Sequence, residues 1–143
     1  MELKTPIEQF RINDPGYHPF LIRDHWQVAQ LNYMEEQDMD NIHKLDVHHY
    51  TDEVFVLLKG KVVLIGAHIQ NGDPVFTVEL MRPNITYNIP KGTWHNIAMT
   101  QGSEVLIVEK ANTHIADFEF LFLSSERQNE LRTKVKQQLN IES

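Results

Sequence analysis

The chain has 143 residues, of which 41% are hydrophobic and 23% charged, so its length and composition fit one soluble globular domain. With 13 basic against 20 acidic residues the net charge is −7, and no cluster of Lys or Arg offsets it, which argues against nucleic acid and anionic membranes as partners. The absence of cysteine excludes disulfides and thiolate chemistry. No apolar run has the length of a membrane span or a signal-peptide core, so we expect a cytoplasmic protein.

Short strand-like segments separated by turns occupy most of the chain. Residues before Asp24 are only weakly patterned, Trp26 to Tyr33 alternates as a strand does, and Glu35 to Asn41 reads as an acidic loop. Further strands are predicted over 42–49, 53–58, 62–69, 75–81, 85–89, 93–99 and 104–110. About eight strands with turns at this spacing are typical of an all-β sandwich or barrel.

The end of the chain has a different pattern. Phe118 to Leu123 alternates and predicts a final strand, which is also a candidate subunit contact. Ser125 to Gln128 fits a capping box, and Leu131, Val135 and Leu139 form one apolar stripe on a short helix. We therefore expect a single domain over residues 1–143, with a barrel at about 26–112 and a strand and helix tail at about 116–140.

Two adjacent histidines and a glutamate mark the segment that carries chemistry. His48 and His49 end one predicted strand, and Glu53 begins a run that is apolar on both faces, where an unpaired carboxylate is costly. Along 42–49 the odd positions carry Leu45 and Val47. Period-two alternation therefore turns His49 inward with them and leaves Asp46 and His48 outside.

The spacing around these residues resembles that of a known family. His49, three residues, Glu53, six residues and Gly60 resemble the second half of the first cupin motif. The segment from Pro90 to His95 resembles the core of the second motif, Pro-x-Gly-x-x-His. The resemblance covers roughly Trp26 to Asn112. It implies a cupin-type jelly-roll (double-stranded β-helix) barrel with a metal near its axis, for which His49, Glu53 and His95 are the ligands.

The sequence departs from the cupin pattern at two positions. Val47 stands where the first motif has another histidine, and Met99 stands where the second motif has asparagine. A rival register uses His48, four residues before Glu53, and puts Asp46 in the first ligand position. Strand parity favours His49, and His48 remains the alternative ligand.

The other candidate residues have weaker signals. Val47, Phe55, Tyr87 and Met99 are expected to line the pocket. His43 is too distant along its strand to share an ion with His49. The remaining histidines lack a partner at ligand spacing and are expected to be structural or at the surface: His18, His25, His68 and His114.

Two imidazoles and one carboxylate with open coordination positions suit a divalent ion such as iron, zinc, manganese or nickel. The sequence therefore predicts a metal-binding cupin, most simply an enzyme acting on a small, polar, oxygen-rich molecule, with isomerase, lyase and dioxygenase chemistry all open. One alternative is a non-catalytic ligand-binding or sensor cupin. Another is a metal-free enzyme similar to the cupin sugar-nucleotide ketoisomerases. We also expect a homodimer, with Phe118 to Phe122 or the N-terminal segment at the contact.

Overall fold

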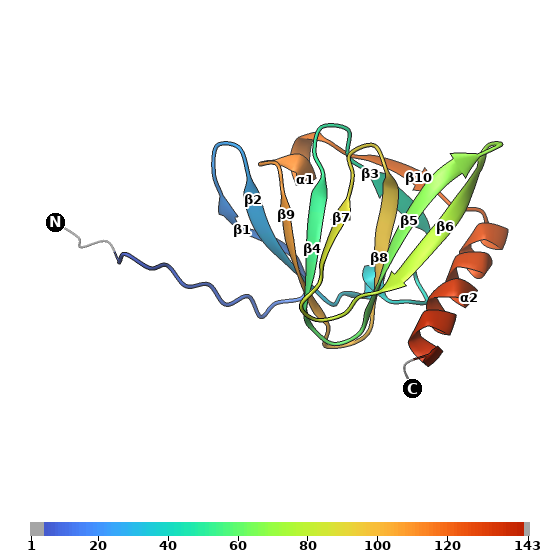
Figure 1. The fold of residues 1–143 in the computed structure, drawn as a ribbon, viewed down its shortest axis with the longest axis horizontal. Coiled ribbons are helices and arrows are strands. Elements are labelled where there is room, and N and C mark those ends of the chain that lie inside the picture. Colours follow the sequence, from blue (N-terminus) through green and yellow to red (C-terminus); the bar gives the residue numbers. More distant parts are fainter. Residues whose placement is uncertain (1–4, 142–143) are drawn as a thin grey trace.

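The computed structural model describes residues 5–141, which form two facing antiparallel sheets of five strands each and a C-terminal helix (Figure 1). The first sheet has the order β1-β2-β9-β4-β7 and the second the order β10-β3-β8-β5-β6. The strands are β1 (Gly16–Ile22), β2 (Gln27–Asn32), β3 (Lys44–Val47), β4 (Glu53–Lys59), β5 (Val62–Gln70), β6 (Asp73–Leu80), β7 (Thr86–Ile89), β8 (Trp94–Met99), β9 (Glu104–Glu109) and β10 (Glu119–Phe122). The helices are a short 3-10 turn (Glu35–Gln37), α1 (Thr113–Ala116) and α2 (Ser125–Ile141). Within residues 5–141, no helix combines the length and the apolar character needed to cross a bilayer.

The space between the two sheets is filled by one apolar cluster. It contains Phe55, Val62, Leu64, Ile97 and Met99, each nearly inaccessible to solvent, together with inward side chains of β2 and β9. These residues alternate along their strands with outward ones, as a half-buried strand requires. The predicted barrel interior is therefore present, and it is closed at its base by large aliphatic side chains.

A second apolar cluster lies on the outer face of the second sheet. Helix α2 covers that face and inserts Leu131 and Val135, both 1% exposed, against Val63, Ile65 and Ala98. The apolar stripe predicted for this helix is confirmed. Its first turn differs from the predicted box, because the Arg127 backbone N–H donates to the Ser124 hydroxyl oxygen at 3.2 Å. The cap is thus one residue earlier than the pattern suggested.

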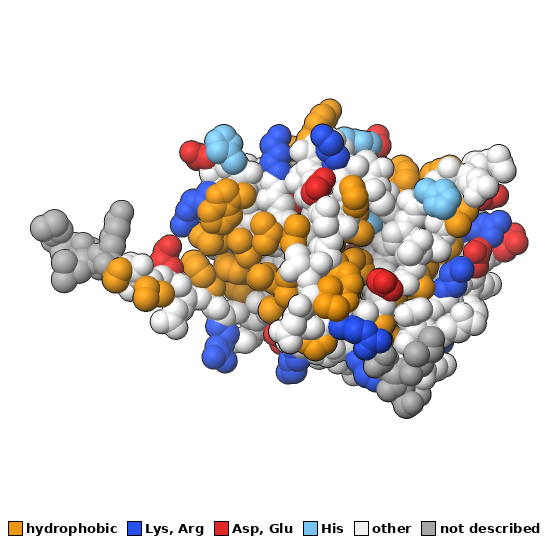
Figure 2. Space-filling model, in the orientation of Figure 1, with side chains coloured by type: hydrophobic (Ala, Val, Ile, Leu, Met, Phe, Trp, Pro, Cys, Tyr) orange, Lys and Arg blue, Asp and Glu red, His pale blue; other side chains and the backbone are white. Residues whose placement is uncertain are grey.

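Among the described residues, no helix covers the outer face of the first sheet. Val28, Val108 and Val54 lie side by side across β2, β9 and β4, and all three are only partly buried. Figure 2 shows the hydrophobic surface that gathers over this face. The apolar character of both faces of β4 therefore comes from a true core on one side and a half-exposed stripe on the other.

Gly60, the last residue of the first motif, is required by a close approach of the backbone. It adopts a φ of 84°, and a Cβ at this position would lie 2.8 Å from Ser103 Cα and Cβ. Only glycine combines a positive φ with that space. The turn from β4 to β5 consequently depends on this residue.

Three sequence predictions differ from the structure. The weakly patterned N-terminal region contains β1, which pairs with β2 over Gly16–Ile22. The predicted strand 42–49 shortens to β3, and His48 and His49 lie in the bend that follows it. The parity argument was wrong about which face of this strand is the barrel interior. Leu45 packs under α2, on the outer face of the sheet, so the even positions face inward.

Truncating Leu131 to Ala should remove the central contact between α2 and the second sheet. We expect a loss of about 2–5 kcal/mol in the free energy of unfolding, as for other fully buried leucines. Urea denaturation measures this loss. Gln137→Ala is the matched control because Gln137 is exposed on the same helix, and an equal loss in both variants would contradict the packing described above.

The homodimer stays a prediction. Strand β10 is an edge of the second sheet, and Phe120 and Phe122 on it are 42% and 66% exposed, while Phe118 just before it is 44% exposed. Unpaired, apolar strand edges favour association. Static light scattering should give the mass of two chains, and a monomer at working concentration would contradict the expectation.

Candidate metal centre

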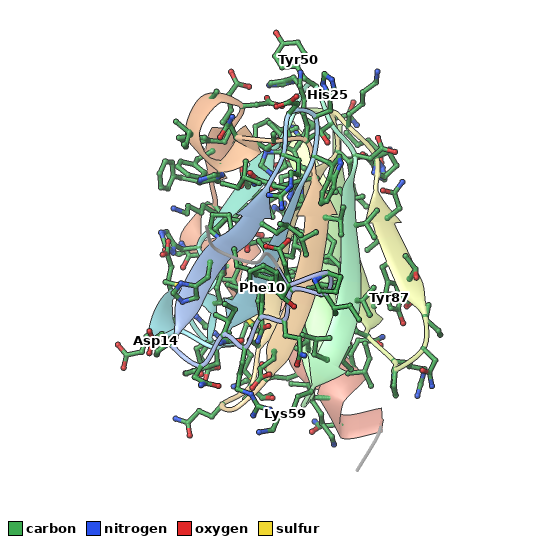
Figure 3. All side chains as sticks on the ribbon, turned by 90° about the vertical axis from the view of Figure 1, so that its left-hand side faces the viewer. Phe10, Asp14, His25, Tyr50, Lys59 and Tyr87 are labelled. Atoms are coloured by element: carbon green, nitrogen blue, oxygen red, sulfur yellow. The ribbon has the colours of Figure 1, made fainter. Side chains whose placement is uncertain are left out.

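The two motif segments meet at one end of the barrel. Figure 3 places Tyr50, next to His49 in the β3–β4 loop, at this end and Lys59, at the end of β4, at the opposite one. The Gly92 backbone N–H donates to the carbonyl oxygen of His48 at 2.7 Å, which joins the β3–β4 loop to the turn before β8. Residues that are more than forty positions apart in the chain are thereby brought together.

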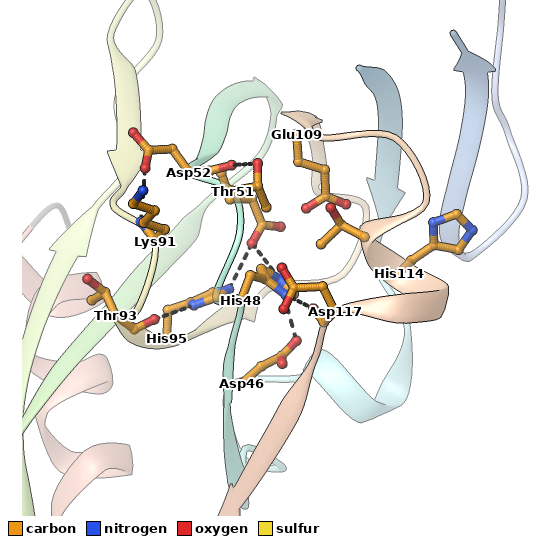
Figure 4. A network of polar contacts seen from close by, with 12 residues as sticks. Asp46, His48, Thr51, Asp52, Lys91, Thr93, His95, Glu109, His114 and Asp117 are labelled. Atoms are coloured by element: carbon orange, nitrogen blue, oxygen red, sulfur yellow. Dashed lines mark hydrogen bonds and ion pairs between the residues drawn. The ribbon is translucent and has the colours of Figure 1, made fainter. Parts of the chain in front are cut away.

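Two imidazoles converge there on one carboxylate oxygen. His48 Nε2 lies 3.0 Å from Glu53 Oε2, and His95 Nε2 lies 2.8 Å from the same atom. Figure 4 labels the two histidines. All three residues are buried, with exposures between 5% and 7%. Glu53 begins β4 in the first sheet and His95 lies on β8 in the second, so the contact bridges the two sheets.

Backbone carbonyls fix the orientation of both rings. His48 Nδ1 lies 2.7 Å from the Asp117 carbonyl oxygen, and His95 Nδ1 lies 2.9 Å from that of Thr93. Because a carbonyl oxygen can only accept, each Nδ1 carries a hydrogen. Each Nε2 therefore faces the Glu53 carboxylate either with a bare lone pair, which needs a shared cation, or with a second proton, which makes the ring an imidazolium.

Asp46 adds a second carboxylate beside the imidazoles. It is paired with His95 across β3 and β8, and its Oδ2 lies 3.8 Å from His48 Nε2. Possible ligand atoms of Asp46, His48 and His95 all lie within 4.8 Å of one another, and so do those of His48, Glu53 and Glu109. Two donor atoms that are each about 2.1 Å from one ion lie roughly 3 Å apart, so the spacing of the two Nε2 atoms from Glu53 Oε2 fits a shared divalent cation.

Asp117 and Asp52 hold the loop that carries His48. The Asp117 carboxylate accepts the backbone N–H groups of His49 and Tyr50, both at 2.9 Å. These two hydrogen bonds lower the pKa of Asp117, although its burial alone would raise it. Asp52 accepts the Lys91 backbone N–H at 2.9 Å. Because both ends of the loop are fixed, the orientation of His48 is set before any ligand binds.

The cluster forms part of the wall of a cavity of about 350 Å³. Glu109 lies on the wall beside it, where Tyr17 donates to its Oε1 at 2.6 Å and Gln27 Nε2 donates to the same atom at 3.1 Å. Phe55 and His114 also line the cavity, and Phe118 and Phe120 stand at its rim. The cavity thus combines a titratable interior with aromatic side chains.

The electrostatics of the cluster are those of strongly paired charges. Burial alone would lower the pKa of His48, but the Glu53 carboxylate outweighs it and raises the pKa to about 9. Burial would raise the pKa of Glu53, and the two imidazoles hold it well below its usual value. Glu109 lacks such partners, so burial and the nearby Glu53 charge raise its pKa to about 7.

The structure brings Glu53 and His95 together as predicted, but with His48 in place of His49. The His49 ring leaves the cluster, and its Nε2 lies 2.8 Å from Glu119 Oε2 at the surface. His48 and Asp46 occupy the rival register because the inward face of β3 is the even one. His43 is likewise exposed and makes contact with Phe122.

The predicted pocket residues have separate locations. Phe55 lines the cavity, whereas Met99 lies in the apolar core and Val47 is buried away from the cavity. Tyr87 lines a shallower surface depression, where its hydroxyl accepts the Arg82 backbone N–H at 2.9 Å. Trp94, on the face opposite His95, packs against the second cluster.

Sequence reasoning missed several cavity residues. His114 was expected to be structural or at the surface, but it lines the cavity and lies 3.1 Å from Gln27 Nε2. Glu109 and Gln27 could have been found, because both occupy inward positions of alternating strands, at the places of β9 and β2 where an apolar residue is expected. Tyr17 and Asp117 gave no signal, since they come from segments without a clear pattern.

Comparisons with known proteins agree with this architecture. No protein-family model matches the chain, and no curated protein sequence does either. Among solved structures, BH2720 from Bacillus halodurans is 16% identical with a TM-score of 0.54, over 82% of this chain and 84% of that one. Streptomyces PAC13 with uridine is 14% identical with a TM-score of 0.52, over 89% and 97% of the two chains. A cupin-2 domain containing protein from Shewanella frigidimarina is 17% identical with a TM-score of 0.48, over 69% and 84%.

The two sheets and their strand order define a double-stranded β-helix of the jelly-roll class. More particularly, the C-terminal helix α2 lies on the outer face of one sheet, and BH2720 and PAC13 share the two-sheet fold over most of their length. The fold predicted from the two motifs is confirmed.

Glu109 should make stability depend on pH in the metal-free protein. Its pKa is raised from 4.5 to about 7, so the folded chain holds this proton more tightly than the unfolded chain. The stabilising contribution is therefore complete below pH 4.5 and is lost as the pH rises through 7, at about 1.4 kcal/mol per unit.

Glu109→Gln remains neutral throughout, so relative to the wild type it should gain stability between pH 4.5 and 7. Urea denaturation with a chelator present measures the difference. A difference between the two proteins that does not change with pH would contradict the assignment.

Proposed function

We propose that this protein is a metal-dependent enzyme that acts on a small, polar molecule in the cavity. His48, Glu53 and His95 would hold the ion, with the Asp46 carboxylate beside them. The observation that carries the proposal is the convergence of two Nε2 atoms on Glu53 Oε2 while both Nδ1 atoms are engaged by backbone carbonyls. Outer partners of this kind orient histidines that bind metals.

The chemistry of the ligand set fits a divalent transition metal. Neutral imidazole and carboxylate donors suit iron, zinc, manganese or nickel. When bound, such an ion supplies a Lewis acid for a substrate oxygen. The protein positions the ion and the substrate. Strands β4 and β8 hold the donor side chains rigidly. The apolar base of the barrel excludes water from one side of the cavity, and the aromatic rim leaves the other side open for the substrate.

A second candidate is a metal-free enzyme, and one observation favours it. The raised pKa of His48, about 9, means that without a metal the ring is an imidazolium paired with Glu53, so the cluster is satisfied by protons alone. His48 and His95 would then act as acid and base. Activity that survives exhaustive chelation would favour this candidate over the first. If the protein is instead a sensor, a ligand would raise its melting temperature without being consumed.

Adjacent histidines provide a matched test of the metal site. His48→Ala should lose the ion, whereas His49→Ala should retain it because the His49 ring lies at the surface beside Glu119. Elemental analysis of untagged protein purified without added metal should find about one ion per chain in the wild type and in His49→Ala.

Because His48 is buried, Glu53→Gln serves as a second variant that keeps the shape of the side chain. It should also lose most of the ion while keeping a cooperative thermal transition. Full metal content in both His48→Ala and Glu53→Gln would contradict the proposed ligand set.

A further inference from the structure

The charges around the cavity restrict what it can hold. Glu36, Asp46, Glu53 and Glu109 all line it, and among the described residues no Lys or Arg does. Glu36 is paired with Lys44 and Glu53 with two imidazoles, so Asp46 and Glu109 are the carboxylates that a ligand meets. A phosphate or carboxylate group entering this space would meet carboxylates without a guanidinium or ammonium partner, which is unfavourable in a low-dielectric site.

Buried oxygen atoms without a hydrogen-bond partner indicate which groups a ligand of this cavity would present. Within residues 5–141, four buried side-chain oxygens accept no hydrogen bond, and they belong to Gln37, Asp46, Glu53 and Glu109. All four residues line this one cavity. Glu53 Oε2 is accounted for by the two imidazoles. Gln37 Oε1, Asp46 Oδ1 and Glu109 Oε2 remain, and leaving such atoms unpaired costs free energy that a ligand O–H or N–H would recover.

Glu109 is held in place for this role. It is 6% exposed, and Figure 4 shows its carboxylate directed toward the His48 region of the cavity. Its Oε1 accepts from Tyr17 and Gln27, while the Gln27 Oε1 accepts the Asn112 backbone N–H at 2.9 Å, which fixes the orientation of the amide. When Glu109 is ionised, its free Oε2 is a fixed acceptor, and a ligand donor would meet it without reorganisation.

The rim supplies an aromatic surface and no available cation. The ring centroids of Phe118 and Phe120 lie 5.3 Å apart, and both side chains are about half exposed. The Lys44 ammonium lies at this rim. It lies 3.9 Å from the centre of the Phe120 ring and 3.2 Å from Glu36, so its charge is already compensated. Aromatic faces at the rim suit the apolar side of a ring-shaped ligand.

We propose that the ligand of this cavity is an uncharged ring compound that presents several O–H or N–H donors, such as a sugar or cyclitol, and that phosphorylated and carboxylated molecules are excluded. Its donors reach Asp46 and Glu109, and its apolar side lies against Phe120. The inference rests on the proposed function only in placing ligand and reaction in the same cavity.

Matched probes that differ in charge test this directly. Phenyl β-D-glucoside, myo-inositol and ribose are compared with phenyl β-D-glucuronide, inositol 1-phosphate and ribose 5-phosphate by calorimetry and ligand-observed NMR at millimolar concentration. We expect binding among the neutral probes and weaker or absent binding of each charged counterpart. Stronger binding of the charged members, or no binding by any probe, would overturn the proposal.

Two phenylalanines on β10 provide a matched pair of variants. Phe120 lines the cavity, whereas Phe122 is exposed on the same strand and lies against His43. Phe120→Ala should weaken the best neutral probe about tenfold, and Phe122→Ala should leave its affinity unchanged. Equal affinities in both variants would place the probe elsewhere and count against the proposal. In Glu109→Gln the charged counterpart should bind relatively better, because one carboxylate has been neutralised.

The measurements are made on both chelated and metal-loaded protein, which separates this inference from the proposed function. Preference for neutral probes should hold in both forms because Glu109 and Asp46 are present in both. If no ion binds but the preference remains, the metal assignment fails and the ligand class stands. If charged probes bind better once metal is loaded, the ligand class fails and the metal assignment stands.

Discussion

Two hydrogen bonds from imidazole to backbone determine what this cavity can do. As long as the Asp117 and Thr93 carbonyls hold the Nδ1 hydrogens of His48 and His95, both Nε2 atoms must face Glu53. Their contacts with one carboxylate oxygen are then stable only with added positive charge, which a proton or a metal ion can supply. The cluster can therefore be stabilised either by protonated imidazoles or by a bound metal ion. A transition metal competes directly with the Nε2 proton of His48.

The fold makes this convergence possible because the strand register aligns polar residues from the two sheets. Glu53 lies opposite Glu109 across β4 and β9, and Asp46 lies opposite His95 across β3 and β8. Both pairs occur at the same end of the barrel, above the apolar cluster. Carboxylates so close together are tolerated because His48 and His95 compensate one of them, and because Glu109 holds its proton up to a pH of about 7.

How far the sequence predicts this site depends on which physical rule governs each residue. Glu53 and His95 were placed correctly because short turns fix their spacing, and turn chemistry is local. The prediction chose His49 instead of His48. Strand alternation separates the residues of a strand into two faces, but it does not tell which face lines the barrel interior. In the second sheet both faces carry apolar residues, so hydrophobicity could not decide between them. Tyr17 and Asp117 could not be placed, since their positions follow from the pairing of β1 and from the α1 turn. Glu109 was visible as a polar residue at an inward position, but nothing in the sequence indicated its neighbours.

Because α2 covers the outer face of the second sheet, the strands of that sheet tolerate fewer substitutions than those of the first. Val62, Val63, Leu64 and Ile65 are all buried, because one pair faces the barrel and the other faces the helix. Substitutional freedom is therefore small at these four positions of β5. On the outer face of the first sheet, which α2 does not cover, apolar residues can be replaced by polar ones. Sequence change should thus accumulate unevenly between the two halves of the barrel, and the half that carries Glu53 and Glu109 would be the more variable framework around an unchanged pair of carboxylates.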